Sequence, residues 1–172
     1  LAYLKRIVSD FTNEIQVIDS VGNFPKIRTI DDGEFPITLL GQSKDQIANL
    51  LAKDTEIMLV SCMFSQDWDY AKQVFKEIRL KCPKSMIIAG GEHITALPKY
   101  SMETAPEIDV CVLGEGETIL KNILQSIEIN DSIDKNLPGT CVRDVDGEVI
   151  QNIMQSRIKD LVDSTWPDWE GF

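Results

Sequence analysis

Residues 87–117 read IIAGGEHITALPKYSMETAPEIDVCVLGEGE and contain the two signals that decide the fold. The apolar runs IIA and DVCVL each stop at glycine, the first at Gly90-Gly91 and the second at GEG (114–116). Glycine has no Cβ atom, so it allows positive φ angles and lets a ligand approach the main chain. The stretch therefore predicts two buried strands with open carboxyl ends.

A third strand and the helices between the strands extend this pattern along the chain. The run IMLVSCMF (57–64) is apolar on both faces, which is typical of a central parallel strand covered by helices on each side. Helices are predicted where apolar residues recur at spacings of three and four. Their stripes are Leu1, Leu4, Ile7, Val8 and Phe11; Ile47, Leu50 and Leu51; Ala71, Val74, Phe75 and Ile78; and Ile119, Leu120, Ile123, Leu124 and Ile127. Alternating strands and helices predict the α/β class, with a doubly wound, Rossmann-like or flavodoxin-like parallel sheet.

Two further segments are assigned from local signals. EIQVIDSV (14–21) is predicted as a strand, followed by a loop rich in Pro, Gly and Asp, and by a helix that begins with a capping box at Ser43 and Gln46. From Pro138 onward, GTCVRDVDGEVIQN predicts a β-hairpin with its turn at Asp146-Gly147. This hairpin forms a C-terminal extension of the sheet domain. The aromatic, proline-broken tail KDLVDSTWPDWEGF is expected to be a connector that docks on something, and not a core element.

Composition narrows the class of protein. The 172 residues suffice for one ordinary domain, and 28 acidic against 17 basic residues give a net charge of −11. This charge disfavours nucleic acid and anionic membrane surfaces as partners. The four cysteines show no CxxC spacing, no apolar run reaches 18 residues, and the opening is no secretory signal. We expect a soluble, cytoplasmic domain with reduced cysteines, no membrane contact and no nucleic acid partner.

The strand ends are the predicted ligand site, because open α/β sheets bind ligands beyond the carboxyl ends of their strands. Neither GxGxxG nor GxxxxGK followed by Ser or Thr is present, which disfavours a nicotinamide cofactor or a nucleoside triphosphate. A large, mostly uncharged ligand with one phosphate fits better. Glycine is also common in strand-to-helix turns that bind nothing, and the sole histidine, His93, is more often a packing residue than a metal ligand.

The quoted motifs resemble the cobalamin-binding domain found at the N-terminus of radical S-adenosylmethionine enzymes. LVSCMF, IIAGGEHITALP and EIDVCVLGEGETI occur in that family's order and at similar spacing. LPGTCVRDVDGEVI is similar to the hairpin after the family's last helix, and IKDLVDSTWPDW resembles the linker into the radical barrel. The likeness covers nearly the whole chain, and the pair GGEH and GEGE is its specific part.

The resemblance implies a role for residues at each strand end. Ser61 would hydrogen-bond the nucleotide tail of cobalamin, which would pass between Gly90-Gly91 and the loop at 114–116. Met63, Phe64 and Gln66 would lie under the corrin ring. The cofactor-binding residues implied are Ser61, Cys62, Met63, Phe64, Gln66, Gly90, Gly91, Glu92, His93, Gly114, Glu115, Gly116 and Glu117. No catalytic residue and no metal ligand is predicted.

The resemblance also implies a domain plan. Residues 1–128 would form the cobalamin-binding domain, 129–158 the hairpin extension and 159–172 a linker to a radical barrel in cis. The family's first strand, which precedes the opening helix, is missing from the sequence, and so is the CxxxCxxC motif that holds an iron–sulfur cluster. The 4Fe–4S cluster and S-adenosylmethionine are therefore expected only in the downstream barrel, whose chemistry would be methyl transfer or another radical reaction. Two alternatives stay open: a degenerate docking domain without cofactor, and a flavodoxin-like domain that binds flavin or nucleotide.

Overall fold

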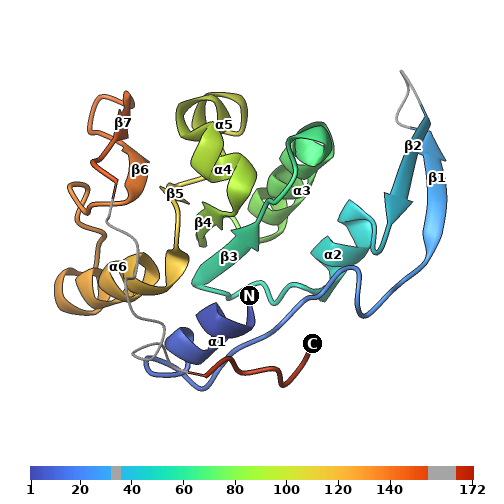
Figure 1. Cartoon of the computed structure of the whole chain (residues 1–172), viewed down its shortest axis with the longest axis horizontal. Coiled ribbons are helices and arrows are strands. Elements are labelled where there is room, and N and C mark those ends of the chain that lie inside the picture. Colours follow the sequence, from blue (N-terminus) through green and yellow to red (C-terminus); the bar gives the residue numbers. More distant parts are fainter. Residues whose placement is uncertain (32–35, 155–165) are drawn as a thin grey trace.

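The computed structural model describes residues 1–31, 36–154 and 166–172 (Figure 1). The elements in chain order are α1 (Ala2–Val8), β1 (Ile27–Asp31), β2 (Pro36–Leu40), α2 (Lys44–Leu50), β3 (Ile57–Ser61), the 3₁₀ helix η1 (Ser65–Asp67), α3 (Trp68–Lys81), β4 (Met86–Gly90), α4 (Glu92–Ala96), α5 (Pro98–Thr104), β5 (Val110–Val112), α6 (Gly116–Asn130), β6 (Thr140–Arg143) and β7 (Val149–Gln151). None of the helices in these ranges is long and apolar enough to cross a membrane.

The main sheet has five strands in the order β3-β4-β5-β6-β7. β3, β4 and β5 are parallel, whereas β6 and β7 continue the sheet in antiparallel pairing. The predicted α/β class is confirmed, and the predicted C-terminal hairpin is present as β6 and β7. The hairpin is part of the same sheet because β6 pairs directly with β5 along Val110–Val112.

Helices cover both faces of this sheet (Figure 1). On one face, Phe75 and Ile78 of α3 and Met102 of α5 pack with the strand residues Ile87 and Ala89. The other face carries a second apolar cluster of buried residues, with partly buried residues of α1 packed against it. The buried members of this second cluster are Ile88, Val110, Val112, Ile119, Leu120, Ile123, Leu124 and Val142. Successive β4 residues therefore point to opposite faces, as the strand period of two requires.

Three local predictions need correction. Residues 14–21 form no strand, because no described strand lies beside them to supply a backbone ladder. The predicted loop after them contains the antiparallel pair β1 and β2, which makes a separate two-stranded sheet. The proline-broken segment after β4 contains two short helices, and Pro98 begins α5, where its missing N–H costs nothing.

The predicted helix start at Ser43 is confirmed, since Ser43 and Gln46 form a capping box. The predicted docking of the tail is visible in residues 166–172, whereas residues 155–165 lie outside the described ranges. The Asp168 amide donates to the Ala2 carbonyl at 3.0 Å, and Lys5 Nζ lies 2.7 Å from Asp168 Oδ2. The pKa of Asp168 is lowered, chiefly by the hydrogen bond from Lys5. The tail therefore docks on α1.

Candidate functional site at the carboxyl ends of the strands

The carboxyl ends of β3, β4 and β5 meet at one edge of the sheet, because the three strands are parallel neighbours. Ser61 is the register partner of Gly90, so the ends of β3 and β4 are level. A Cβ atom at Gly90 would have Val112 of β5 as its nearest neighbour, at 3.9 Å. The sheet thus brings the first and second predicted turns side by side.

The turn after β3 presents one free hydroxyl and two apolar side chains. Ser61 is exposed, and its hydroxyl makes no hydrogen bond within the described part of the chain. Met63 is 49% exposed and Phe64 is 63% exposed, and Gln66 is also exposed in η1. Apolar side chains this exposed beside a strand end are available to a ligand with an apolar face.

Cys62 is buried and contributes through its backbone. Its amide donates to the Gly90 carbonyl at 2.8 Å, and its carbonyl accepts from the His93 amide at 3.2 Å. Burial, with a smaller contribution from the nearby Asp67 carboxylate, raises the pKa of the Cys62 thiol to about 12. The thiol is therefore protonated at neutral pH and is a poor metal ligand.

The turn after β4 places two glycines in different surroundings. Gly91 has a φ of 103°, and a Cβ atom there would lie 2.4 Å from the Cys62 carbonyl oxygen. Any other residue at Gly91 would push the two turns apart. Gly90 has space instead, since a Cβ atom would meet only ordinary van der Waals contact at 3.9 Å. Gly90 is the open position of the pair.

His93 lies beneath this edge rather than on it, with only 2% of its surface exposed. Its Nδ1 is 2.8 Å from Ser65 Oγ, and its ring stacks on Trp68 with the ring centroids 4.3 Å apart. Its Nε2 has no hydrogen-bond partner in the described residues, and burial lowers the pKa of the ring. His93 thus fastens η1 to α4 as a neutral ring. Glu92, in the first turn of α4, is exposed.

The third predicted turn follows β5 and opens α6. Gly114 is exposed with a φ of 82°, and its amide donates to Thr95 Oγ1 of α4 at 2.9 Å. Glu115 is the N-cap residue of α6, and Glu117 lies in its first turn. Gly116 has a packing role, because a Cβ atom there would lie 3.3 Å from Leu4 Cδ2 of α1.

The sequence interpretation missed Thr95 and Trp68, which tie the three turns together. Thr95 joins the α4 turn to Gly114, and Trp68 stacks on His93 while its Nε1 donates to Thr104 Oγ1 at 3.1 Å. Thr95 is a hydroxyl residue four positions after Gly91, which is only a weak sequence signal for a role at the site. No signal in the sequence pointed to Trp68.

The candidate residues do not all border one cavity. A large cavity beside β3 has Ser61, Cys62, Met63, Phe64 and Gln66 in its lining, whereas its lining does not include the glycine turns at 90–91 and 114–116. Those turns follow β4 and β5, which are inner strands of the sheet. In the described residues, no group of three or more His, Cys, Asp or Glu side chains is placed to hold a metal ion.

Comparison with known proteins identifies relatives of this arrangement. The model of the B12 binding domain matches residues 27–124, more than half of the chain. An anaerobic magnesium-protoporphyrin IX monomethyl ester cyclase of Cereibacter sphaeroides is 33% identical over 101 residues, which cover 58% of this chain and 16% of the cyclase. The cobalamin-dependent radical SAM methyltransferase TokK of Streptomyces tokunonensis is 26% identical over 145 residues, covering 83% of this chain and 20% of TokK.

A solved structure shares the fold. The radical S-adenosylmethionine methyltransferase TsrM of Kitasatospora setae, with cobalamin and a 4Fe–4S cluster bound, superposes with a TM-score of 0.65 at 18% identity, covering 97% of this chain and 28% of TsrM. The chain therefore spans less than a third of each of these relatives. By the match of the family model over residues 27–124, the chain belongs to the B12-binding domain family.

Proposed function

We propose that this domain binds cobalamin across the carboxyl ends of β3, β4 and β5. The observation that carries the proposal is the pairing of Ser61 with Gly90 at adjacent strand ends. Ser61 offers an exposed hydroxyl, and Gly90 leaves space where a side chain would stand. A long nucleotide tail needs a polar contact and side-chain-free backbone at the same place.

The neighbouring residues fit the rest of the cofactor. Met63 and Phe64 offer exposed apolar surface beside Ser61, which suits the face of a corrin ring. On the other side of the site, Gly114 has a positive φ, and the hydrogen bond from its amide to Thr95 Oγ1 fixes the position of the turn. Glu92, Glu115 and Glu117 would lie around the bound cofactor, and the buried His93 would support the site from beneath. Bound cobalamin would supply methyl-transfer or related radical chemistry, and the residues of this chain would hold and orient it.

We also propose that the domain presents its cofactor to a radical S-adenosylmethionine barrel in the whole protein, which would carry the 4Fe–4S cluster. The relatives that support this are several times longer than the region matched. The proposed boundaries are 1–128 for the cofactor domain, 129–158 for the hairpin extension and 159–172 for the linker. Four free, buried cysteines support a reducing, cytoplasmic location.

The test is to mix the purified protein with hydroxocobalamin, remove free cofactor by gel filtration and record the visible spectrum. Cobalamin absorbance should elute with the protein. Gly90→Ala should weaken the affinity at least about tenfold, which is about 1.4 kcal/mol, because the new methyl group occupies the path of the tail. Its free energy of unfolding should change little, since the methyl group meets no protein atom closer than 3.9 Å.

Gly91→Ala is the matched control. It should lower the stability of the protein by at least about 2 kcal/mol, because alanine is strained at positive φ and would clash with the Cys62 carbonyl. Absence of co-eluting absorbance from a folded wild-type protein would refute cobalamin binding and favour a docking domain. Retention of flavin mononucleotide in the same assay would favour the flavodoxin-like alternative.

A further inference from the structure

Met154 follows β7 but lies beside the turn after β5. With the chain neighbours of Gly114 set aside, the only described atom within 4 Å of a Cβ atom placed there is Met154 Cε, at 3.7 Å. β6 lies between β5 and β7 in the sheet, so the Met154 side chain reaches past the beginning of β6 to the third turn. The sequence interpretation placed residue 154 in the hairpin extension, outside the cofactor domain.

Backbone hydrogen bonds fix the position of Met154. The Leu113 amide donates to the Gly139 carbonyl at 2.8 Å, and the Gly139 amide donates to the Ile153 carbonyl at 2.7 Å. The pairing of the sheet thus continues beyond the ends of β5 and β7, and Gly114 and Met154 are the next residues of their segments. The backbone of the sheet therefore brings Met154 to the third turn.

Met154 lies on the same face of the sheet as the open position at Gly90. Ile88 belongs to the apolar cluster on the α6 face, so Gly90, two residues later, points to that face as well. A Cβ atom at Gly90 would accordingly lie nearest to Val112 of the same cluster. Val149 packs against the opposite cluster, and the strand period of two then turns Met154 toward the α6 face. A ligand that passes over Gly90 on this face and continues across β5 therefore reaches Met154.

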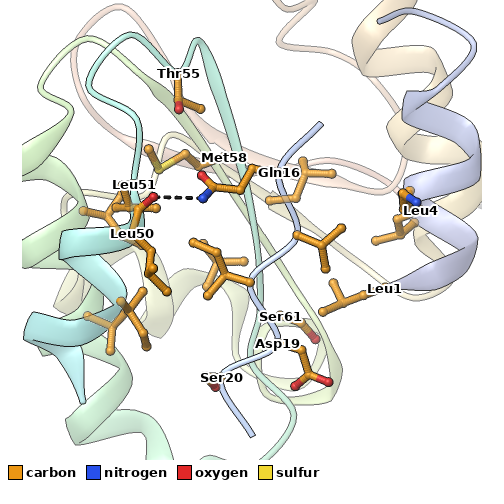
Figure 2. Close-up of a pocket in the computed structure, with 18 of the residues that line it drawn as sticks. Leu1, Leu4, Gln16, Asp19, Ser20, Leu50, Leu51, Thr55, Met58 and Ser61 are labelled. Atoms are coloured by element: carbon orange, nitrogen blue, oxygen red, sulfur yellow. Dashed lines mark hydrogen bonds between the residues drawn. The ribbon is translucent and has the colours of Figure 1, made fainter. Parts of the chain in front are cut away.

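The chain has two exposed methionines, and both lie at this edge of the sheet. Met63 is 49% exposed and Met154 is 52% exposed, whereas the other three methionines are buried or partly buried. Met63 lines the cavity beside β3 together with Ser61 (Figure 2), and Met154 does not. The two methionines therefore lie on opposite sides of the proposed site, with the end of β4 between them.

A methionine side chain suits an aromatic partner. Its thioether is flexible and polarizable, and its sulfur makes favourable contacts at about 5 Å from an aromatic ring. Half of the Met154 side chain is exposed, so it can contact a ligand without rearrangement of the protein. The nucleotide tail of cobalamin ends in an aromatic base, which is a partner of this kind.

We propose that Met154 is a further cobalamin-binding residue, and that it packs on the aromatic base of the nucleotide tail. The inference rests on the proposed function, in which the tail passes Gly90 and the corrin ring lies over Met63 and Phe64. A base beside Gly114 meets Met154, whereas the ring does not, because the ends of β4 and β5 lie between the two methionines. The hairpin extension thus contributes a side chain to the site.

The first experiment compares cobalamin with cobinamide, which has the corrin ring but no nucleotide tail. Both dissociation constants are measured by spectral titration of the wild type, Met154→Ala and Met63→Ala. Met154→Ala should weaken cobalamin binding at least about threefold, as the loss of one sulfur–aromatic contact predicts, and should leave cobinamide binding unchanged. Met63→Ala is the matched control, because Met63 is almost equally exposed but lies beside the ring. It should weaken the binding of both compounds by the same factor.

Methyl NMR gives a second readout that does not depend on affinity. The chain has five methionines, so isotope labelling of their methyl groups gives a spectrum with few signals. Met154→Leu assigns the Met154 signal by removing it, and this variant should keep most of the cobalamin affinity because leucine has a similar volume. Cobalamin should shift the Met154 methyl signal through the ring current of the base, whereas cobinamide should not.

Equal weakening of cobalamin and cobinamide binding by Met154→Ala would overturn the proposal, since the contact would then be with the ring. Unchanged cobalamin affinity would overturn it as well, and so would a Met154 methyl signal that both compounds shift alike. All three outcomes leave cobalamin binding itself intact. A folded wild type that binds neither compound would instead refute the proposed function, and this inference with it.

Discussion

Gly90 and Gly91 follow one another at the end of β4 but serve different purposes. Gly91 is required by the protein itself, because its positive φ and the nearby Cys62 carbonyl exclude a side chain. Gly90 is not required in this way, since a Cβ atom would fit there. Gly116 differs again, because it lets α6 approach Leu4 of α1. Of these three glycines, Gly91 and Gly116 are therefore required by packing within the protein, whereas Gly90 leaves space for a ligand.

The stability of the protein should depend on pH through His93. Burial lowers the pKa of the folded ring below its ordinary value of 6.5, so the unfolded chain binds a proton more readily. The free energy of unfolding should therefore fall as the pH drops from 6.5 toward the lowered pKa. Below that pKa both states are protonated, and this loss is complete. Chemical denaturation at a series of pH values measures the effect.

His93→Asn is the control for this pH dependence. Asparagine can still bond to Ser65 Oγ but does not titrate, so the part of the pH dependence that lies just below 6.5 should disappear. The variant should be less stable at neutral pH, because it loses the stack on Trp68. An unchanged pH profile in His93→Asn would show that other groups cause the dependence.

At the scale of elements, α4 connects the turns after β3, β4 and β5. His93 bonds to Ser65 in η1, and Thr95 bonds to the Gly114 amide two residues beyond β5. These bonds come from residues only two positions apart in one short helix. α4 therefore sets the relative positions of the three turns that form the proposed cobalamin site.

Removing the Thr95 hydroxyl should loosen only the third turn. Thr95→Val keeps the branched shape but leaves the Gly114 amide without its acceptor, so that amide should exchange faster and stability should fall by about 1 kcal/mol. Cobalamin affinity should weaken in parallel, because Gly114 flanks the proposed site. Thr95→Ser keeps the hydroxyl and should behave like the wild type. Equal exchange at Gly114 in all three proteins would contradict the assigned bond.

The elements that sequence predicted correctly are those with a strong local signal. The apolar run of β4 ends at two glycines, α6 has apolar residues at spacings of three and four, and Ser43 and Gln46 form the capping box that begins α2. Residues 14–21 have an equally good strand pattern but form no strand, because a strand also needs a neighbour, which no local pattern encodes. β1 and β2 were missed because their alternation is interrupted by residues typical of loops.

The candidate site was predictable in outline from the same motifs. Glycine marks the strand ends, and the parallel order brings those ends together. The interlocking of the turns was not predictable, because the contact of Gly91 with Cys62 and the bond from Gly114 to Thr95 depend on the packing of separate segments. The burial of His93 depends in the same way on Trp68, which belongs to a different element.

At the scale of the whole molecule, the edge strand β3 is packed less completely than the inner strands of the main sheet. β4, β5 and β6 each have a neighbouring strand on both sides, and the buried Cys111 and Cys141 lie at facing positions of β5 and β6. β3 borders the large cavity instead, and Cys62 lies where that cavity meets the strand end. The cavity side has the fewest contacts to lose, so it should open at the lowest free energy.

Thiol labelling should reveal this difference in the native protein. All four cysteines are buried, and burial raises the pKa values of Cys62, Cys111 and Cys141, so labelling requires opening of the structure. Cys62 should react first with a thiol reagent, with Cys111 and Cys141 much later, as followed by mass spectrometry of tryptic peptides. In denaturant all four should react at similar rates, which controls for the reagent. Cys62 lines the cavity and Cys111 does not. Equal labelling rates at these two thiols in the native protein would mean that the sheet opens as one unit. The difference in packing would then have no effect on local stability.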